Sequence, residues 1–353
     1  MSKSFDWPIL IYILIICGFG AAINSSVAHE VLLQQIIFYV VGLGVFFLCS
    51  RIDYRIYNSL GKIIYILAAV LLGITLLLGL ETRGAMRWIP LGPFRLQFSE
   101  IFKPLLVTSF ASFLLNRNRN KFTSYLVSLL WISFPTLLVF KQPDLGSSLV
   151  YIAGFFAMII TSGTNIIYLV ISFFGFGITT PLVWKFLADY QKNRILSFLS
   201  PHIDPLGASY NSIQAVITVG SGMLFGRGLG RGTQSHLAFL PERHTDFVFA
   251  SLAEEMGFVG SAVLLAVYFL LIWRIFSVAS QTKSPEARLI CIGIGVMILV
   301  QVFISVGMNL GIVPVTGITL PLVSYGGSSV LATMIALGII ENIASSKLSE
   351  NMI

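Results

Sequence analysis

The segment 240–258 reads LPERHTDFVFASLAEEMGF, and it decides how the rest of the chain is interpreted. It begins as a polar, charged turn and continues directly into an apolar stretch typical of a membrane-spanning helix. Asp246 therefore lies at the mouth of a predicted span. Because a carboxylate at the edge or in the interior of a bilayer is energetically costly, we interpret Asp246 as a functional residue. The alternative is an acid that caps the helix or lies in its first turn.

Composition places the chain among integral membrane proteins. It has 353 residues, of which 56% are hydrophobic and 10% are charged, whereas a soluble domain carries about 25% charged residues. The net charge is +7. We interpret the excess of basic residues as setting the orientation of the chain in the membrane and as contacting anionic lipids. The chain contains no basic tract interleaved with aromatic residues, so we exclude nucleic acid as a partner. The three cysteines have no metal-ligand spacing and are predicted to pack within spans.

Apolar runs of about 17–25 residues can cross a bilayer. We predict an all-α, polytopic membrane protein that forms a single domain over 1–353, with one long extracytoplasmic loop at about 185–245. Ten spans are predicted, at about 8–23, 31–49, 61–80, 101–115, 122–140, 146–162, 165–184, 246–276, 288–311 and 325–344. Ten crossings place both termini on the same side of the membrane.

The charges of the short loops predict which side that is, because Lys and Arg are enriched in cytoplasmic loops. The loops at 24–30 and 312–324 carry no Lys or Arg, which predicts that they face outward. With both termini in the cytoplasm, the inner loops carry the basic residues Arg51, Arg55, Lys62, Arg117, Arg119, Lys121, Lys283 and Arg288.

Two outer segments break this charge pattern. Residues 81–100 mix Arg, aromatic residues, Gly and Pro, which favours a segment that lies in the membrane interface. Glu100 and Lys103 follow at a spacing that places both on one helix face. The second segment, about 185–245, contains four arginines, and residues 211–219 within it are predicted to form a short amphipathic helix. The arginines are Arg194, Arg227, Arg231 and Arg243.

Several of these residues have two possible roles. Arg83, Arg87 and Arg95 either anchor an interfacial segment at lipid headgroups or bind pyrophosphate, because the guanidinium matches phosphate oxygens in pairs. Lys103 either belongs to a site with Glu100 or extends towards the membrane surface.

Other features near the long loop are weighed in the same way. His244 beside Asp246 is a candidate for contact with phosphate or a divalent ion. Glu254 and Glu255 are predicted to pair with other helices of the bundle. Residues 226–232 show a GxGxG pattern with no strand before it, so a dinucleotide site is excluded, and a flexible loop with two cations is expected. Residues 314–329 place Gly and Pro at membrane depth, which favours irregular backbone lining a cavity over an ordinary outer loop.

Five motifs together resemble one known family. They are 240–247 with 253–255, QPDLG at 142–146, DPLG at 204–207, PVTG at 314–317 and SYGGS at 324–328. They occur in the order and at the spacing of the SEDS family (shape, elongation, division and sporulation), and the resemblance covers nearly the whole chain. Arg243 before His244 is more similar to the elongation branch of the family than to the division branch, which is the alternative.

The resemblance implies an enzyme, a peptidoglycan glycosyltransferase that polymerises lipid II into β-1,4 glycan strands at the outer face of the bacterial cytoplasmic membrane. It also implies a partner, a class B penicillin-binding protein transpeptidase that crosslinks the nascent glycan strand. Asp246 matches the essential acid of the family, and Glu100 and Lys103 match the polar pair of a neighbouring cavity.

The expected mechanism is inverting transfer with Asp246 as the catalytic base. Lipid pyrophosphate leaves as a stabilised anion, so cations suffice in place of a general acid. The chemistry also admits a divalent cation, Mg²⁺ or Mn²⁺, in that role. The predicted substrate-binding residues are Arg87, Glu100, Lys103, Arg194, Glu242, Arg243, His244 and Ser324. The rival hypotheses are a lipid II flippase, because ionisable residues and broken helices also mark transport paths, and a scaffold that only holds the partner enzyme.

Overall fold

The structure is a computed structural model that describes residues 5–82, 85–91, 94–117, 122–187, 189–200, 207, 209–237 and 239–350. Helices make up most of it. The first half of the chain contains α1 (Trp7–Val27), α2 (His29–Arg51), α3 (Tyr54–Ser59), α4 (Gly61–Leu78), β1 (Leu80–Thr82), β2 (Ala85–Leu91), β3 (Phe94–Leu96), α5 (Phe98–Leu115), α6 (Phe122–Lys141) and α7 (Leu145–Thr161). The second half contains α8 (Ile166–Phe186), α9 (Asp189–Leu199), α10 (Tyr210–Ser221), α11 (Thr233–His236), α12 (Val248–Gln281), α13 (Pro285–Asn309) and α14 (Gly327–Glu350).

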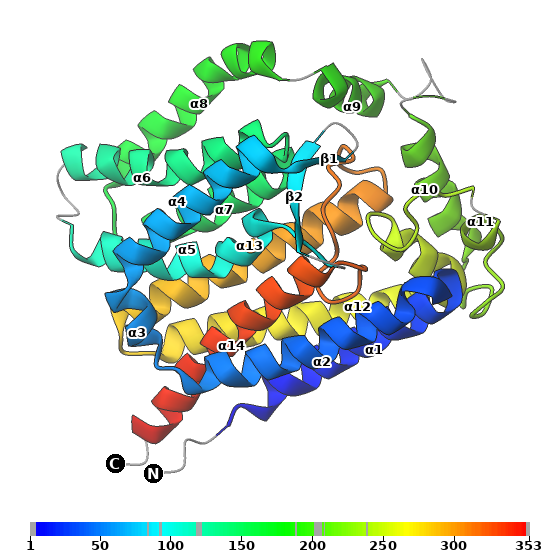
Figure 1. Cartoon of the computed structure of the whole chain (residues 1–353), viewed down its shortest axis with the longest axis horizontal. Coiled ribbons are helices and arrows are strands. Elements are labelled where there is room, and N and C mark those ends of the chain that lie inside the picture. The colour runs from blue at the N-terminus through cyan, green and yellow to red at the C-terminus, as the bar shows by residue number, and fades with distance from the viewer. Residues whose placement is uncertain are drawn as a thin grey trace.

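Each predicted span coincides with one helix of the bundle (Figure 1). Within the described ranges, eight helices are long and apolar enough to cross a membrane: α1, α2, α4, α5, α6, α12, α13 and α14. The other two that coincide with predicted spans are α7, an apolar helix of 17 residues, and α8. The polytopic helical fold is therefore confirmed, whereas the number of ten crossings stays a prediction.

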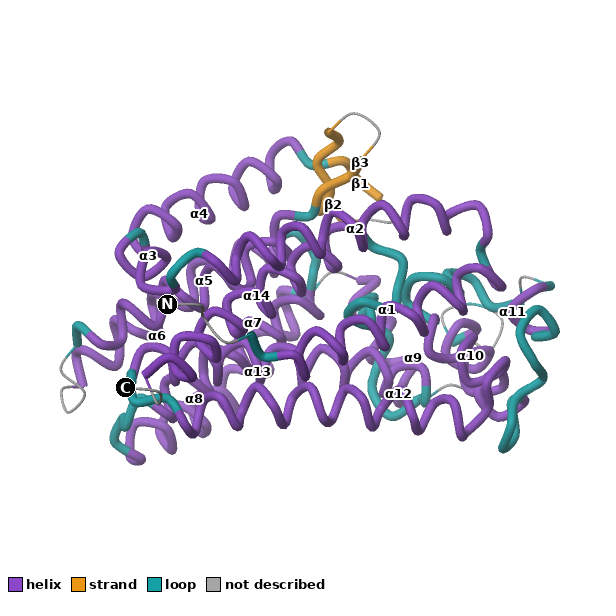
Figure 2. Tube along the Cα trace, turned by 90° about the horizontal axis from the view of Figure 1, so that it is seen from below, coloured by secondary structure: helices purple, strands orange, loops and turns teal. Residues whose placement is uncertain are grey.

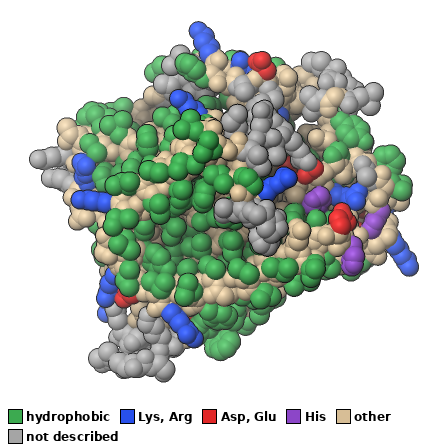
Figure 3. Space-filling view, viewed as in Figure 1, with side chains coloured by type: hydrophobic (Ala, Val, Ile, Leu, Met, Phe, Trp, Pro, Cys, Tyr) green, Lys and Arg blue, Asp and Glu red, His purple; other side chains and the backbone are tan. Residues whose placement is uncertain are grey.

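The bundle has an inner and an outer layer. The most apolar stretches of α13 and α14 are 72% and 83% buried, whereas those of α2 and α4 are each 22% buried. The exposed side chains of the outer helices are large and apolar, for example Leu77 and Ile63. Apolar side chains dominate the middle of the face shown in Figure 3, with Lys and Arg mainly at its margins. This distribution is expected for a protein surrounded by lipid.

The first and last helices meet at one end of the bundle (Figure 1). The backbone N–H of Asp6 donates to Glu341 in α14 at 2.7 Å. Arg274 in α12 donates from Nε to both carboxylate oxygens of Asp6, at 3.2 and 3.0 Å. The start of α1 therefore lies beside the last turns of α14, which agrees with an even number of crossings. That this end faces the cytoplasm stays a prediction.

The all-α class holds for the chain as a whole, with one departure between α4 and α5. Here β1, β2 and β3 form a three-stranded antiparallel sheet, in which Leu80 pairs with Trp88 and Pro90 with Arg95. Figure 2 shows it standing at the end of α4. That residues 81–100 lie in the membrane interface stays a prediction. Arg83 lies outside the described residues. The sheet leads directly into α5 and so positions Arg87 and Glu100.

α12 is interrupted at Gly257, where φ is +67° and ψ is −167°. The carbonyl oxygens of Glu254 and Glu255 accept hydrogen bonds from the backbone N–H groups of Arg227 and Gly228, at 2.9 and 3.0 Å. The N–H groups of 258 and 259 donate to the carbonyl oxygens of 223 and 224. A Cβ at Gly257 would overlap the backbone of this loop. The glycine-rich segment 226–232, expected to be flexible, is therefore attached to α12 by backbone hydrogen bonds.

Candidate functional site

The connection between α13 and α14 is irregular backbone inside the bundle. Residues 320–324 are buried, and the carbonyl oxygens of 321–324 each accept a hydrogen bond from one side chain of the surrounding helices. Buried carbonyls in a membrane need such partners because no water reaches them. The donors are Tyr268, Tyr39, Asn24 and Gln35. The prediction of irregular backbone is confirmed, and residues 320–324 are enclosed by protein. The depth of this connection in a membrane and a cavity along it stay predictions.

Asp246 lies in the turn that precedes α12, beside this connection. The N-cap of α12 is Phe247, and the first turn contains no acid, so Asp246 lies one residue before the cap. Glu242 has a φ of +52°, a left-handed conformation that costs a non-glycine residue roughly 1–2 kcal/mol. Its carbonyl oxygen accepts from the N–H groups of Thr245 and Phe247. Strained turns of this kind cluster at functional sites.

Arg194 is brought to Asp246 from a distant part of the chain. An ideal Cβ on Gly317 would lie 3.4 Å from Oδ2 of Asp246 and 3.9 Å from Nη1 of Arg194. The carboxylate and the guanidinium therefore approach the same bare Cα atom, and Gly317 itself has a φ of +73°. Asp246 and Arg194 are both partly exposed. An acid that can accept a proton and a cation that can bind phosphate thus lie beside the same glycine.

The other predicted residues of this turn lie around Asp246. Arg243 donates from Nε to the carbonyl oxygen of Val27 at the end of α1, at 3.1 Å. The centre of the His244 ring lies 5.8 Å from that of Tyr325. Burial raises the pKa of Tyr325, and the charge of Arg95 offsets part of this rise. Ser324 is 1% exposed. Because its hydroxyl donates to the carbonyl oxygen of Thr245 at 2.6 Å, its geometry favours holding the turn over contact with substrate.

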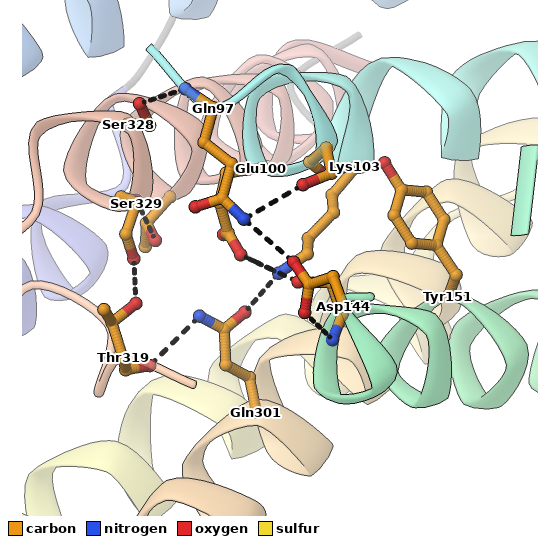
Figure 4. A network of polar contacts seen from close by, with 12 residues as sticks. Gln97, Glu100, Lys103, Asp144, Tyr151, Gln301, Thr319, Ser328 and Ser329 are labelled. Atoms are coloured by element: carbon orange, nitrogen blue, oxygen red, sulfur yellow. Dashed lines mark hydrogen bonds and ion pairs between the residues drawn. The ribbon is translucent and has the colours of Figure 1, made fainter. Parts of the chain in front are cut away.

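Glu100 and Lys103 form a second polar group, in the first turns of α5. Lys103 Nζ lies 2.6 Å from Glu100 Oε1 and 3.2 Å from Oε1 of Gln301 in α13. Ser147 of α7 donates to the same Glu100 oxygen at 3.3 Å. Figure 4 shows Glu100, Lys103 and Gln301 pointing toward one another from α5 and α13. Lys103 is buried, so it does not extend to the surface; that the pair forms part of a site stays a prediction.

A small cavity opens beside this pair. Its volume is about 30 Å³, and it lies between α5, α13 and α14 with the polar pair and Gln301 on one side. The rest of its lining is mainly apolar and consists of Pro104, Ile294, Met297, Ile298, Ala332, Thr333 and Ala336. A volume of this size holds about two water molecules. The cavity therefore belongs to the Glu100–Lys103 group, and Asp246 is not part of its wall.

Asp144 extends the second group and was not predicted as a site residue. It caps α7 by accepting from the N–H of Ser147 at 3.1 Å, and it accepts from Gln97 Nε2 at 2.8 Å. Arg87 on β2 lies 3.6 Å from its carboxylate and donates to the carbonyl oxygen of Pro143 at 2.7 Å. Asp144 precedes an apolar helix, as Asp246 does, so the argument applied to Asp246 could have found it. Gln97 and Gln301 gave no local signal.

Residues 316–319 connect the two polar groups. Gly317 faces Asp246 and Arg194, while the carbonyl oxygen of Thr319 accepts from Nε2 of Gln301 at 3.2 Å. Gln301 in turn accepts from Lys103 (Figure 4). Between them, Ile318 packs against Gly146, where a Cβ would overlap its side chain. Most of the predicted residues therefore gather around one buried connection, Arg87 and Lys103 on one side and Asp246 and Arg194 on the other.

Glu254 and Glu255 hold the glycine-rich loop instead of reaching Asp246. Glu254 accepts from the N–H groups of Gln234 and Ser235, at 2.8 and 2.9 Å. Glu255 accepts from Ser26 of α1 at 2.6 Å and lies 3.0 Å from Nε2 of His236. Glu255 therefore pairs with a bundle helix, α1, as predicted. The printed partners of Glu254 lie on α11 of the long loop, so the prediction that this acid pairs with a bundle helix is wrong.

A resident metal site was considered because the chemistry admits a divalent cation. Within the described parts of the chain, no group of three or more His, Cys, Asp or Glu side chains lies close enough together to hold a metal ion. These residues therefore do not fit a bound Mg²⁺ or Mn²⁺ on their own, and no catalytic step is assigned to one.

Comparison with known proteins identifies the family and the fold. The family model described as "Cell cycle protein", which covers FtsW, RodA and SpoVE, matches residues 9–349. The chain belongs to the SEDS family. Among curated SEDS relatives, the peptidoglycan glycosyltransferase MrdB of Escherichia coli K12 is 42% identical over 308 residues, which cover 86% of this chain and 82% of MrdB. The stage V sporulation protein E of Bacillus subtilis is 35% identical over 317 residues, covering 88% and 86%.

Solved structures share the SEDS fold over its whole length. One, described as "Structural coordination of polymerization and crosslinking by a peptidoglycan synthase complex", has a TM-score of 0.86 and 32% identity, covering 98% of this chain and 99% of that chain. The rod shape determining protein RodA of Thermus thermophilus has a TM-score of 0.75 and 30% identity, with 98% of each chain covered. The resemblance of the five motifs is therefore confirmed at the level of the family and the fold.

Proposed function

We propose that this SEDS protein is a glycosyltransferase that polymerises lipid II into β-1,4 glycan strands, with Asp246 as the catalytic base. The observation that carries the proposal is the approach of Asp246 and Arg194 to the same Cα atom, that of Gly317. The names of the relatives support it, because MrdB and several FtsW proteins are called peptidoglycan glycosyltransferases. The similarity to a rod shape determining protein favours a role in cell elongation over one in division.

The proposed reaction needs one acid and nearby cations. Asp246 accepts the proton of the 4-hydroxyl of the acceptor sugar while that oxygen attacks the anomeric carbon of the donor. The bond from this carbon to the pyrophosphate oxygen breaks, and undecaprenyl pyrophosphate leaves with the electron pair. Attack opposite the leaving group inverts the anomeric centre. A positioned general base contributes about 10²–10⁴-fold to the rate.

Arg194 is the proposed ligand of the departing pyrophosphate, because a guanidinium matches phosphate oxygens in pairs. Arg243 and Lys103 are proposed to add positive charge along the donor, and His244, Glu242, Glu100 and Arg87 to line the sugar and peptide path. Ser324 is proposed to act indirectly, by holding the turn that carries Asp246. Stabilising a charge that develops on the leaving group is the largest single contribution in many enzymes.

The proposal places the reaction at the outer face of the bacterial cytoplasmic membrane, with both termini in the cytoplasm. Two observations support it. The start of α1 and the end of α14 lie together, whereas Asp246 lies beside the connection from α13 to α14 and near the end of α1. The loops at this second end, 24–30 and 312–324, carry no Lys or Arg, as expected of outer loops.

We also propose that the chain works with a class B penicillin-binding protein, which crosslinks the strands that it makes. The structural relative described as a peptidoglycan synthase complex that coordinates polymerization with crosslinking supports this. Co-expression of the two proteins should give a complex that survives purification in mild detergent. Separate elution of the two proteins would oppose the proposal.

The decisive test incubates the purified protein with lipid II in detergent and resolves the glycan product by size. Wild type should make polymer, and Asp246→Asn should make none while keeping the fold. Asp189→Asn is the matched control, because Asp189 lies on α9 in the same outer region with its side chain 98% exposed, and it should polymerise as wild type does. Polymer from Asp246→Asn at the wild-type rate would overturn the assignment.

The same protein in liposomes tests the rival hypothesis. Movement of lipid II across the bilayer without polymer in either assay would identify a flippase. Normal growth of cells that carry Asp246→Asn as their only copy would instead identify a scaffold.

A further inference from the structure

The turn that carries Asp246 is held by its carbonyl oxygens. Those of residues 243–246, four in succession, each accept a hydrogen bond from a residue elsewhere in the fold. The donors are Ser251 Oγ at 3.1 Å, Tyr325 N at 2.8 Å, Ser324 Oγ at 2.6 Å and Asn309 Nδ2 at 3.0 Å, in the order 243 to 246. Only the last of these bonds reaches the backbone of the acid itself.

Asn309 is the final residue of α13 and is fully buried. Its side-chain oxygen accepts from the N–H of Ala250 in the first turn of α12, at 2.9 Å. Its two N–H groups donate to the carbonyl oxygens of Asp246 and of Ser305, at 3.0 and 2.7 Å. One amide therefore joins the end of α13, the turn and the start of α12, and it holds the carbonyl group of Asp246.

We propose that Asn309 is a positioning residue for Asp246, a role that rests on the function proposed above. It touches neither sugar nor pyrophosphate. It holds the Asp246 backbone so that the carboxylate stays beside Gly317 and Arg194. A displacement of about 1 Å in such an arrangement can cost roughly 100-fold in rate. Removing a buried amide whose oxygen and nitrogen are both hydrogen-bonded also destabilises the fold. The experiment therefore has to distinguish a loss of stability from a loss of positioning.

Asn342 supplies the matched control. It is also buried, its side-chain oxygen accepts from the N–H of Tyr54 at 3.0 Å, and its Nδ2 donates to the carbonyl oxygen of Ser50 at 2.8 Å. It therefore bridges two backbone segments as Asn309 does, but at the opposite end of the bundle from Asp246. Replacing either residue removes the same kind of interaction.

The experiment compares Asn309→Leu with Asn342→Leu in the full-length protein. Turnover is expressed per lipid II binding site, so unfolded protein does not count, and KM and the melting temperature are measured alongside. The two variants should melt at similar temperatures. Asn309→Leu should lose about 10- to 100-fold in kcat with KM for lipid II changed by less than about threefold, whereas Asn342→Leu should keep the wild-type kcat.

Asn309→Asp and Asn342→Asp provide a second pair that keeps the volume and the bond from the backbone N–H. Asn309→Asp loses the donor to Asp246 and should also lose turnover, whereas Asn342→Asp should not. Equal kcat values for both positions, in whichever pair folds, would overturn the positioning role. Asp246→Asn is run beside them: if it polymerises normally, the proposed function itself fails, whereas an inactive Asp246→Asn with active Asn309 variants refutes the role of Asn309 alone.

Discussion

Lys103 Nζ lies 2.6 Å from Glu100 Oε1, and both side chains are less than a tenth exposed. The pair lies three residues apart on α5, and its remaining contacts come from Gln301 of α13 and Ser147 of α7. Two opposite charges buried in this way are tolerated in a membrane protein because each compensates the other. Glu100 and Lys103 therefore have to be considered as one unit.

Removing one charge of this pair should be more damaging than removing both. Lys103→Met leaves Glu100 buried without its cation, which typically costs about 3–5 kcal/mol. Glu100→Gln likewise leaves Lys103 buried without its anion. The double variant Glu100→Gln/Lys103→Met should recover part of that loss. Melting temperature in detergent is the measurement.

The control is another Lys–acid pair at the same spacing, Asp189 and Lys192 on α9. Its atoms are 3.7 Å apart and Asp189 is exposed, so Lys192→Met should leave the melting temperature unchanged. A double variant of Glu100 and Lys103 that is no more stable than the two single variants would mean that the two charges do not compensate each other.

Gly317→Ala should impair catalysis beyond its effect on stability. The substitution strains a positive φ, which costs roughly 1–2 kcal/mol, and it also places a methyl group against Asp246 and Arg194. Gly311→Ala is the control, because Gly311 lies in the same connection with a φ of +69° and a Cβ there meets only Val216. The two variants should be destabilised to a similar degree.

Polymerisation of lipid II separates them. Gly311→Ala should retain turnover close to wild type once stability is matched, whereas Gly317→Ala should lose about tenfold or more. Equal turnover in the two variants would mean that the space beside Gly317 is not used by the substrate.

Local signals predicted most of the helices and the turn with Asp246. A run of apolar residues long enough to cross a bilayer is visible in the chain itself, and so is an acid at the start of such a run. The approach of Arg194 to Asp246 is different, because it depends on how α9 folds back over the connection at Gly317. No local pattern encodes that distance, and Arg194 lies in none of the five motifs; it was predicted only as a cation for the pyrophosphate.

The features that were missed depend on tertiary contacts. β1 and β3 have three residues each, too short for a clear alternation of polar and apolar residues, and their pairing with β2 defines them. Gln301 is an amide inside the apolar helix α13, and Gln97 is the residue before α5. Their roles appear only when α5, α7 and α13 pack together. The interruption at Gly257 lies within an apolar run and is stabilised by a loop about thirty residues earlier in the sequence.

Tyr57 should make stability fall at alkaline pH. This residue lies on α3, and burial together with a hydrogen bond to Cys49 raises its pKa above the usual value, which is about 10 for an unperturbed tyrosine. Above that value the unfolded chain loses the proton while the folded chain keeps it. The free energy of unfolding therefore does not depend on this group below about pH 10 and decreases as pH rises further. Tyr57→Phe should reduce the slope of melting temperature against pH between about 9 and 11.

Tyr210→Phe serves as the comparison for that slope. Tyr210 is on α10 near the surface, where its hydroxyl donates to the carbonyl oxygen of Phe239 in an exposed contact. The slope should change less in this variant than in Tyr57→Phe. An unchanged slope in Tyr57→Phe would show that another group causes the alkaline loss.

Gly257→Ala should prevent α12 from forming its interruption. The φ of +67° and ψ of −167° at this residue lie in a region open essentially only to glycine, and the added methyl group would overlap the backbone at Gly226. Relief requires residues 223–228 to move away from α12, which breaks their four backbone hydrogen bonds to it. Folded yield from size-exclusion chromatography in detergent should therefore fall steeply.

Gly73→Ala, in the regular helix α4 with open space around its Cα, should be neutral or more stable by about 0.5–1 kcal/mol. Wild-type yield and melting temperature for Gly257→Ala would show that the interruption of α12 is not required for folding.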